Sequence, residues 1–351
     1  MEAANKNLSQ HNLSKGRIYY YLRSHLPRDH EKLLSLVTES RKKTGDHRVT
    51  LAGMIALSSI CIRDCTYCAF RASRSSEERF RLTRSEILES ADRARKAGIK
   101  WLILKSGDDP GLGHNMVAEL VKELKRTMGF SISLSMGERD PEVYKKWYES
   151  GATHYWLRQE TCDPHLYRRI KPSMFWVDRT KAINSLAKIG YSLGGGILVG
   201  LPNQSYEGLT EDVLTFLDRG LMASVIEPYL PPPETAGYDL IQKPENLIAE
   251  PDIGTMEKLV AITRVLRPDI LITLSNAHIE KYFELDKGRL LESGANSMVL
   301  DFTPSHLSGF ESGTPFTGKP VSGKGDIEQV KRNLENLGYE PTFDPPPQHS
   351  D

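Results

Sequence analysis

The sequence of 351 residues lacks several features that would assign it to common classes of protein. It has no apolar run of about 18 residues, so no transmembrane helix is expected. Its polar N-terminus lacks the apolar core of a secretory signal. Charge of neither sign is in excess, with 46 basic and 46 acidic residues, whereas nucleic-acid-binding proteins usually have a basic excess. We therefore expect neither a membrane nor a nucleic-acid partner.

Cysteine is also scarce, with only four in the chain. Three of them, Cys61, Cys65 and Cys68, lie together in the stretch SSICIRDCTYCAF at CxxxCxxC spacing. So few and so clustered cysteines argue against a disulfide framework and favour a reducing, cytoplasmic compartment. The fourth, Cys162, has no cysteine near it in the sequence, and we interpret it as a small passive residue.

The CxxxCxxC stretch is a candidate metal centre, because soft thiolate ligands favour zinc, copper(I) or an iron–sulfur cluster. A structural zinc ion needs four ligands, and the nearest histidine on the C-terminal side is the distant His114. Three cysteines would leave one iron of a [4Fe–4S] cluster open to bind a further molecule. The alternatives are buried apolar cysteines or disulfide partners that cluster by chance.

Strand-like and helix-like stretches alternate along most of the chain. A strand of β-branched and aliphatic residues is predicted at 49–59, directly before the cysteines. Seven more strands are predicted at 101–105, 130–135, 153–157, 193–199, 223–227, 270–274 and 296–300. Eight βα units in this order predict an α/β fold, a (βα)8 barrel of the TIM type. The cysteines would then lie at the C-terminal end of the first strand, where barrel enzymes place their chemistry.

The segments on either side of the barrel follow different patterns. Residues 17–43 have helical periodicity with a break near Pro27, and they predict a helical extension packed on the barrel. A last helix is predicted at 329–337, before the Pro-rich stretch DPPPQHS. We divide the chain into an N-terminal polar segment with the helical extension (1–45), the barrel (46–315) and a C-terminal helix with a Pro-rich tail (316–351).

Polar residues follow several predicted strands and would face the mouth of the barrel. They are Gly107 and Asp108 after the second strand, Ser135 and Glu138 after the third, Arg158 and Glu160 after the fourth, and Arg179 in the next helix. Glycine and aspartate also fit a turn, the charges could form ion pairs, and Arg179 could lie on a helix surface. A functional site is favoured, because charges gathered at strand ends would share one cavity. Glycines 194–196 inside the fifth strand predict close approach of a ligand.

The cysteine stretch, with Tyr67 just before its last cysteine, resembles the radical S-adenosylmethionine (SAM) superfamily. The order of SGDDP, LSMGE, LRQET, FWVDR and GGGILVGLPNQ along the chain is similar to the biotin-synthase-like branch. Within that branch the chain most resembles the HydE family of [FeFe]-hydrogenase maturases, and the methylornithine synthase (PylB) family is a near relative. The likeness extends from about residue 49 to about residue 304.

The resemblance implies the cofactors and the residues that hold them. Cys61, Cys65 and Cys68 would bind a [4Fe–4S] cluster, and its open iron would bind the amino and carboxylate groups of SAM. Tyr67 would lie beside the adenine. The remaining SAM pocket would be formed by Gly107, Asp108, Ser135, Glu138, Arg158, Glu160 and Arg179. Asp108 stands where the family pattern has a glutamate.

The ends of the seventh and eighth strands would face the substrate, because strand ends on this side of a barrel converge on one cavity. The residues concerned are Thr273, Ser275, Asn276, Asp301 and Thr303. The segment 273–278 offers hydroxyls, an amide and an imidazole but no carboxylate. Such a lining suits a neutral or anionic small molecule better than a free ammonium group, although Asp301 could supply the missing charge.

The activity implied by the resemblance is reductive cleavage of SAM to methionine and a 5′-deoxyadenosyl radical, with an electron from a flavodoxin- or ferredoxin-type donor. The leading hypothesis is a cofactor-biosynthesis enzyme of hydrogenase maturation that acts on a small iron-bound cysteine species. The alternative is a carbon-skeleton mutase like methylornithine synthase, or another cofactor-building radical SAM enzyme. A third hypothesis is an iron–sulfur electron-transfer or scaffold protein, which would not need a pocket for SAM.

Overall fold

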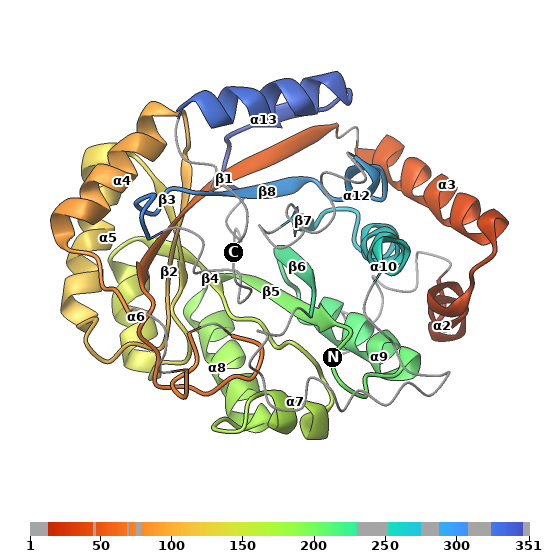
Figure 1. The fold of residues 1–351 in the computed structure, drawn as a ribbon, viewed down its shortest axis with the longest axis horizontal. Coiled ribbons are helices and arrows are strands. Elements are labelled where there is room, and N and C mark those ends of the chain that lie inside the picture. The colour runs from red at the N-terminus through yellow and green to blue at the C-terminus, as the bar shows by residue number, and fades with distance from the viewer. Residues whose placement is uncertain are drawn as a thin grey trace.

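The computed structural model describes residues 13–44, 47–68, 70–74, 79–229, 252–274, 288–307 and 324–346. Its centre is a barrel of eight parallel strands, which confirms the predicted fold (Figure 1). The strands are β1 (Arg48–Ser58), β2 (Trp101–Ser106), β3 (Ser131–Ser135), β4 (Ala152–Trp156), β5 (Ser192–Val199), β6 (Ala223–Pro228), β7 (Leu271–Leu274) and β8 (Ser297–Asp301). Each strand pairs with the next, and β1 pairs with both β2 and β8, so the sheet closes on itself.

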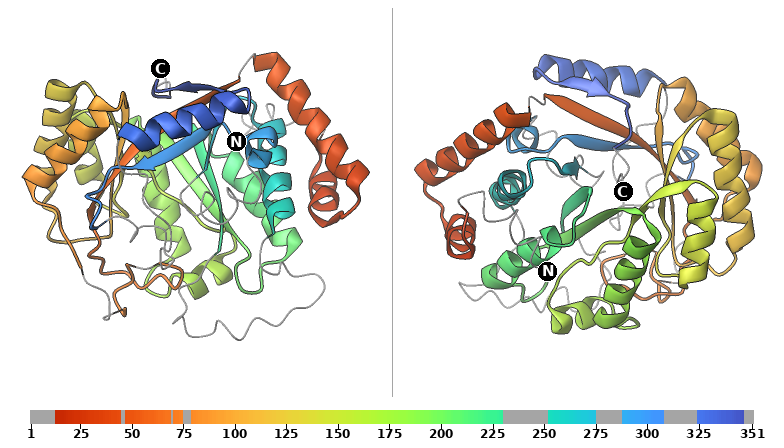
Figure 2. Two further views of the ribbon diagram at one scale, coloured as in Figure 1. Left: turned by 45° about the horizontal axis from the view of Figure 1, so that its top comes forward. Right: turned by 180° about the vertical axis from the view of Figure 1, so that it is seen from behind.

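Helices pack around the outside of the barrel, as Figure 2 shows from two further directions. They are α4 (Arg84–Lys96), α5 (His114–Met128), α6 (Pro141–Glu149), α7 (Pro164–Ile170), α8 (Trp176–Ile189), α9 (Tyr206–Leu217), α10 (Ile253–Leu266) and α12 (Arg289–Glu292). Local sequence sets their ends: Thr83 and Glu86 form a capping box before α4, and Gly129 ends α5 at φ 74°. Most of the helix that periodicity predicts over 279–291 lies outside the described residues. Within the described ranges no helix is long and apolar enough to cross a membrane.

From residue 13 onward, two helices precede the barrel, α2 (Lys15–Arg23) and α3 (Pro27–Thr44). They confirm the predicted helical extension and its break, since Pro27 takes the first position of α3, where proline is tolerated. Helix α3 packs on α10, and α2 packs on α9 and α10, as their neighbouring positions in Figure 1 show. Ile18, Leu22 and Leu33 are fully or almost fully buried by this packing.

Below the C-terminal ends of the strands, the barrel interior is filled by side chains rather than by solvent. Trp101 and Trp156 stack there with ring centroids 6.3 Å apart, and the Trp101 Nε1–H donates to the Ser133 hydroxyl at 2.7 Å. Met54 and Val225 belong to the same inward-facing cluster. The functional cavity must therefore lie above this layer, at the C-terminal ends of the strands.

The glycines of β5 make room for the protein's own atoms, so the prediction that a ligand approaches there is wrong. A Cβ atom at Gly194 would lie 2.4 Å from the Trp156 ring, and one at Gly195 would lie 2.7 Å from Leu221. A Cβ at Gly196 would lie 2.5 Å from a backbone oxygen and 3.0 Å from the stem of Arg158. These glycines therefore act indirectly, because Gly194 and Gly196 leave room for Trp156 and Arg158, and Gly195 leaves room for Leu221.

The chain ends in α13 (Lys324–Asn336) and a short strand, β9 (Glu340–Thr342). Helix α13 confirms the predicted last helix and begins earlier than expected. Strand β9 pairs in parallel with the first residues of β1. Neither β9 nor α7 is predicted from the sequence, because three residues around a proline and seven residues of mixed polarity carry too little periodicity.

Candidate active site

The cysteine loop, residues 59–74 without residue 69, is held against the end of β2 by backbone contacts. The Ile62 N–H donates to the Asp108 carbonyl at 3.1 Å, and the Cys61 sulfur accepts from the Asp108 N–H at 3.2 Å. A Cβ atom at Gly107 would lie 2.2 Å from the Ile60 carbonyl oxygen. Gly107 is thus required by the fold, since any larger residue would push the cysteine loop off the strand end.

One cavity of about 230 Å³ at the barrel mouth brings the predicted site together. Its lining includes all three clustered cysteines. It also includes every residue predicted to contact SAM, namely Tyr67, Gly107, Asp108, Ser135, Glu138, Arg158, Glu160 and Arg179. Apart from Arg179 in α8, these residues lie at the ends of β1 to β4 or in the segments that follow them, so the closure of the barrel is what unites them.

The three cysteines suit a cluster better than a single ion. Burial raises the pKa of the Cys68 thiol to about 11 and also raises the pKa of Cys65. Buried thiols of this kind become stable thiolates when bound to metal. In the described part of the chain, no three Cys, His, Asp or Glu side chains are close enough to hold one metal ion. Thiols spread around a shared cavity are what a [4Fe–4S] unit needs, because each binds a different iron.

Cys162 lies apart from this group, as the sequence suggests. It follows β4 on the outer side of the sheet, and its sulfur is 4.0 Å from the Asp212 carbonyl oxygen on α9. Burial raises the pKa of its thiol to about 12. A neutral thiol in this position is a packing residue rather than a fourth ligand.

Glu160 is the most constrained acid of the cavity. Its Oε1 accepts from the Tyr67 hydroxyl at 2.8 Å and from Arg158 Nε at 3.2 Å, and it lies 3.6 Å from Lys171 Nζ. Burial alone would raise the pKa of Glu160, but Arg158 and Lys171 hold it below its usual range. Its Oε2 is buried and has no hydrogen-bond partner within the described residues. A charged, unfilled acceptor in the cavity wall is well suited to receive a hydroxyl of a bound molecule.

The backbone of Glu160 is also unusual, with φ at 70°. A side-chain-bearing residue in this left-handed region is strained and persists only where its surroundings hold it. The Glu160 N–H donates to the Gly196 carbonyl, and its own carbonyl accepts from the Leu198 N–H. This bridge to β5 fixes the direction of the carboxylate.

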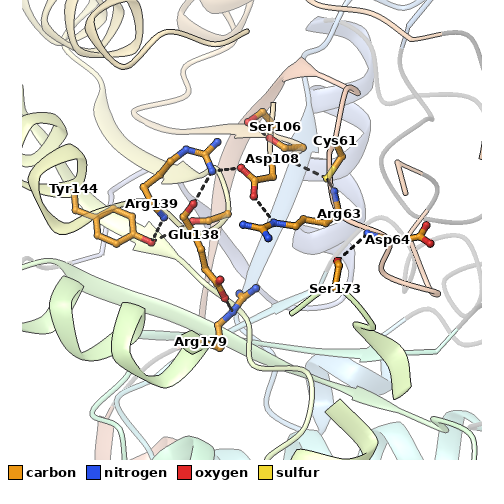
Figure 3. Close-up of polar contacts among 12 residues, drawn as sticks. Cys61, Arg63, Asp64, Ser106, Asp108, Glu138, Arg139, Tyr144, Ser173 and Arg179 are labelled. Atoms are coloured by element: carbon orange, nitrogen blue, oxygen red, sulfur yellow. Dashed lines mark hydrogen bonds and ion pairs between the residues drawn. The ribbon is translucent and has the colours of Figure 1, made fainter. Parts of the chain in front are cut away.

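Arg179 points into the cavity although it belongs to the first turn of α8. It is only 5% exposed, which excludes the alternative of a surface arginine. Its Nε donates to Glu138 at 2.6 Å and its Nη1 donates to the Arg158 carbonyl at 2.9 Å. Figure 3 shows the Arg179 and Glu138 side chains meeting between α8 and the end of β3.

Asp108 and Asp109 are neighbours in the sequence that point to different places. Asp108 faces the cavity and accepts from Arg63 Nε at 2.6 Å and from Arg139 (Figure 3). Asp109 is turned beneath the cysteine loop and accepts from the Ser58 hydroxyl and from two nitrogens of Arg81. Although burial opposes it, these donors hold the pKa of Asp109 below its usual range. Asp109 thus stabilises the loop, while Asp108 remains a candidate contact for a ligand.

The cavity contains further charged residues that the sequence reasoning missed. They are Arg63, Lys105, Lys171 and Glu227. Burial and the nearby Arg179 lower the pKa of Lys171 to about 8. The position of Lys105 could have been noticed, because a lysine ends the apolar run WLILK at the mouth of the second strand. Lys171 gave no such signal, since it follows the unpredicted helix α7.

The structure describes three of the five predicted substrate-facing residues, and none of the three is part of the cavity lining. Thr273 and Asp301 are buried at the ends of β7 and β8. Burial raises the pKa of Asp301, while contacts with Thr303 and the charge of Lys105 oppose the rise. The Thr303 hydroxyl accepts from the Ala56 N–H, so its contact is with β1. Ser275 and Asn276 lie outside the described residues.

Comparison with known proteins identifies the family of this chain. A family model described as the radical SAM superfamily matches residues 55–215. The [FeFe] hydrogenase maturase subunit HydE of Thermotoga maritima is 34% identical over 275 residues, which span 78% of this chain and 76% of that protein. This chain belongs to the radical SAM superfamily. It is therefore a radical SAM enzyme, whose cofactors are a [4Fe–4S] cluster and SAM.

Other known proteins are similar along nearly the whole chain. A 3-methylornithine synthase of Methanosarcina acetivorans is 27% identical over 329 residues, covering 89% of this chain and 85% of its own. The crystal structure of methylornithine synthase (PylB) superposes with a TM-score of 0.81 at 25% identity over 97% of both chains. HydG, a maturase of the [FeFe]-hydrogenase, shares the fold, with a TM-score of 0.78 at 18% identity over 98% of this chain and 76% of its own.

Proposed function

We propose that Cys61, Cys65 and Cys68 hold the [4Fe–4S] cluster and that SAM occupies the rest of the same cavity. When bound, the two cofactors supply the reductive cleavage of SAM to methionine and a 5′-deoxyadenosyl radical. The unpartnered Oε2 of Glu160 supports a ribose hydroxyl as its donor. Tyr67, fixed by its bond to Glu160, offers its ring beside the adenine.

The two ends of the methionine part of SAM would be bound by opposite charges. Arg158 and Arg179 are the candidates for its carboxylate, because a guanidinium can bind a carboxylate through two parallel hydrogen bonds. Asp108 is the candidate for its ammonium group, although it would share its oxygens with Arg63 and Arg139. The role of the chain is to orient the bound molecules and to exclude water, since the cofactors carry the radical chemistry.

The substrate we propose is a small iron-bound cysteine species, as for a HydE-type maturase. The observation that carries this proposal is the 34% identity to HydE over 275 residues. The position of Lys105 supports this substrate. Lys105 lines the cavity, and its positive charge lowers the pKa of both Cys68 and Asp301 against the effect of their burial. Lys105 thus lies between the cluster side and the eighth strand, where it can bind the carboxylate of a cysteine ligand.

A methylornithine-synthase-like mutase is the second candidate, and Asp301 favours it. This buried carboxyl group lies at the barrel mouth, and an ammonium group of lysine could take one of its oxygens. The match to PylB over 97% of both chains also supports this candidate. We rank it second because the identity to the synthases is lower, at 27%.

The test is to reconstitute the protein anaerobically and supply SAM and a reductant with one of two substrates. With the iron–cysteine species, we expect a 5′-deoxyadenosyl adduct on sulfur; with lysine, we expect no methylornithine. Lys105→Met should raise the KM for the iron–cysteine species, whereas Asp301→Asn should have little effect on it. Methylornithine formation without an adduct, lost in Asp301→Asn, would reverse the ranking.

A further inference from the structure

A second and larger cavity lies beside the one that we propose for SAM. It has a volume of about 830 Å³ and is bounded by the segments that follow β1, β2 and β3 and by one side of α8. Exposed side chains such as Asp140, Asp178 and Lys188 are part of its lining, so this outer cavity is in contact with solvent. The proposed function makes no use of it.

Three charged residues, Arg63, Asp108 and Glu138, line both the outer cavity and the SAM cavity. They therefore stand between the two cavities and are named here the partition. Figure 3 shows their side chains close together. Asp108 also pairs with Arg139, which lines the outer cavity, and Glu138 pairs with Arg179, which lines the SAM cavity. The partition is thus linked by ion pairs to both sides.

The partition is closed by contacts that side-chain rotation can undo. Asp108 accepts from Arg63 Nε at 2.6 Å, and Glu138 accepts from Arg179 Nε at 2.6 Å. The Arg63 side chain is 30% exposed, so its guanidinium can turn outward and be solvated. Such rotamer changes are fast and need no movement of a strand.

The charges of the partition favour the passage of a molecule that carries both signs of charge. An ammonium group can take the place of a guanidinium at Asp108 or Glu138, and a carboxylate can pair with the released Arg63. A zwitterion therefore leaves none of these charges unpaired as it passes, whereas an apolar molecule would separate the pairs without replacing them. The outer cavity likewise offers both signs of charge, for example Lys181 and Asp178 of α8.

We propose that the methionine formed by cleavage of SAM leaves through the partition into the outer cavity, while the adenosyl part stays behind. The proposal rests on the proposed function, which gives the methionine carboxylate to Arg158 or Arg179 and its ammonium group to Asp108. The methionine end is then beside the partition. Tyr67 and Glu160, which would hold the adenosyl end, line the SAM cavity and not the outer one.

The test narrows the outer cavity without changing the partition. Ala182→Trp and Ser185→Trp each add a bulky ring on the side of α8 that lines this cavity. Ala187→Trp adds the same ring at an exposed position of α8 that does not line it. Each cluster-loaded protein is given 5′-deoxyadenosine and labelled methionine, and release of the label into excess unlabelled methionine is followed. We expect about tenfold slower release in the two cavity variants and no change in Ala187→Trp.

The affinity for methionine distinguishes a route from a binding site. A blocked route leaves the bound and free states unchanged, so association should slow as much as release, and the dissociation constant should stay within about twofold of the wild-type value. Release of 5′-deoxyadenosine should be unchanged in all three variants. Arg63→Met removes the ion pair with Asp108 that closes the partition, and it should speed the association of methionine.

Wild-type release rates in Ala182→Trp and Ser185→Trp would overturn the proposal. Iron content and melting temperature show which variants are folded, and either of the two suffices if the other is not. Weaker methionine binding at an unchanged association rate would also overturn it, and so would an equal slowing of 5′-deoxyadenosine release, which would indicate a common exit. Failure of the wild type to bind methionine together with 5′-deoxyadenosine would instead contradict the proposed function.

Discussion

Two buried carboxyl groups on opposite sides of the segment after β4 show how surroundings decide the role of an acid. Glu160 faces the cavity next to Arg158 and Lys171, and its pKa is held below the usual range. Asp212 of α9 faces the outer side, and its contacts within the described residues are neutral donors. These are the Thr161 hydroxyl, the Cys162 N–H and the Gln204 amide, at 3.0, 2.5 and 3.2 Å. Burial raises the pKa of Asp212 to about 6.

The difference teaches that hydrogen bonds from neutral donors do not offset the cost of burying a charged acid, whereas nearby cations do. Glu160 has fewer neutral donors than Asp212 but two cations, and the cations outweigh the cost of burial. It therefore stays an anion with one free oxygen, which is useful for binding. Asp212 accepts from Thr161 and Cys162 in the segment after β4 and from Gln204 after β5, so it ties both segments to α9 and its use is structural.

The largest effect is expected when the charge of Glu160 is removed. Glu160→Gln should weaken SAM binding by about 3–4 kcal/mol, several hundredfold, because it removes a desolvated anionic acceptor. The substitution also takes away the carboxylate next to Lys171 and leaves Arg158 with Glu227 as its ion-pair partner. Equilibrium binding of SAM to the reconstituted protein measures this. Iron content should be unchanged, since Glu160 is not a proposed ligand. An affinity equal to that of the wild type would mean that Glu160 serves only the ion pairs.

Asp212→Ala is the matched substitution on the other side of the segment after β4. It leaves two side-chain donors and the Cys162 N–H without their acceptor, which should lower the free energy of unfolding by about 3 kcal/mol. Denaturant titration of the reconstituted protein gives this value. SAM affinity of the folded variant should match the wild type. If SAM binding fell as it does in Glu160→Gln, the two sides of the segment would not be independent.

The free energy of unfolding should also depend on pH because of Asp212. Its pKa is raised from 3.8 to about 6, so between these pH values the folded state keeps a proton that the unfolded state has lost. Stability from this group is therefore present below about pH 4 and is lost as pH rises to 6, by up to about 3 kcal/mol. Unfolding measured from pH 4 to 7 should show a shallower fall for Asp212→Asn. Parallel curves for the two proteins would contradict the raised pKa.

The smallest effect is expected at the thiol beside Asp212. Cys162→Ala removes a buried sulfur whose contact with the Asp212 carbonyl is long, at 4.0 Å, so stability should change by less than about 1 kcal/mol. Iron content and SAM cleavage should be retained. Alanine at Cys61, Cys65 or Cys68 should abolish both, which gives a sharp internal control. Loss of iron in Cys162→Ala would place a ligand outside the cavity.

The sequence allows the barrel and most of its cavity to be predicted because both depend on local patterns. Apolar runs locate the strands, and the closure of parallel strands brings their ends together, so Asp108, Glu138 and Arg158 can be placed without coordinates. The CxxxCxxC spacing likewise predicts that three cysteines share one site, and all three line the same cavity. All eight residues predicted to contact SAM do line one cavity.

What the sequence does not reveal depends on contacts between distant segments. Nothing in SGDDP distinguishes Asp108 from Asp109. Asp108 faces the cavity, whereas Asp109 points away from it because it accepts hydrogen bonds from Ser58 and Arg81. The strained backbone of Glu160 is set by β5, which lies far along the chain. The glycines of β5 suggest a ligand when read alone, but the side chains that fill their space come from β4 and from the segment before β6.

The pairing of β9 with β1 has a consequence for the order of events during synthesis. β1 is among the first elements to leave the ribosome, yet two of its three partner strands, β8 and β9, are among the last. About 270 residues separate Cys68 from β9, so at ordinary translation rates the first strand waits on the order of 15–50 s for its final neighbour. During that interval the sheet is an open arc. The nascent chain therefore exposes its thiols to the cell before the barrel can close around them.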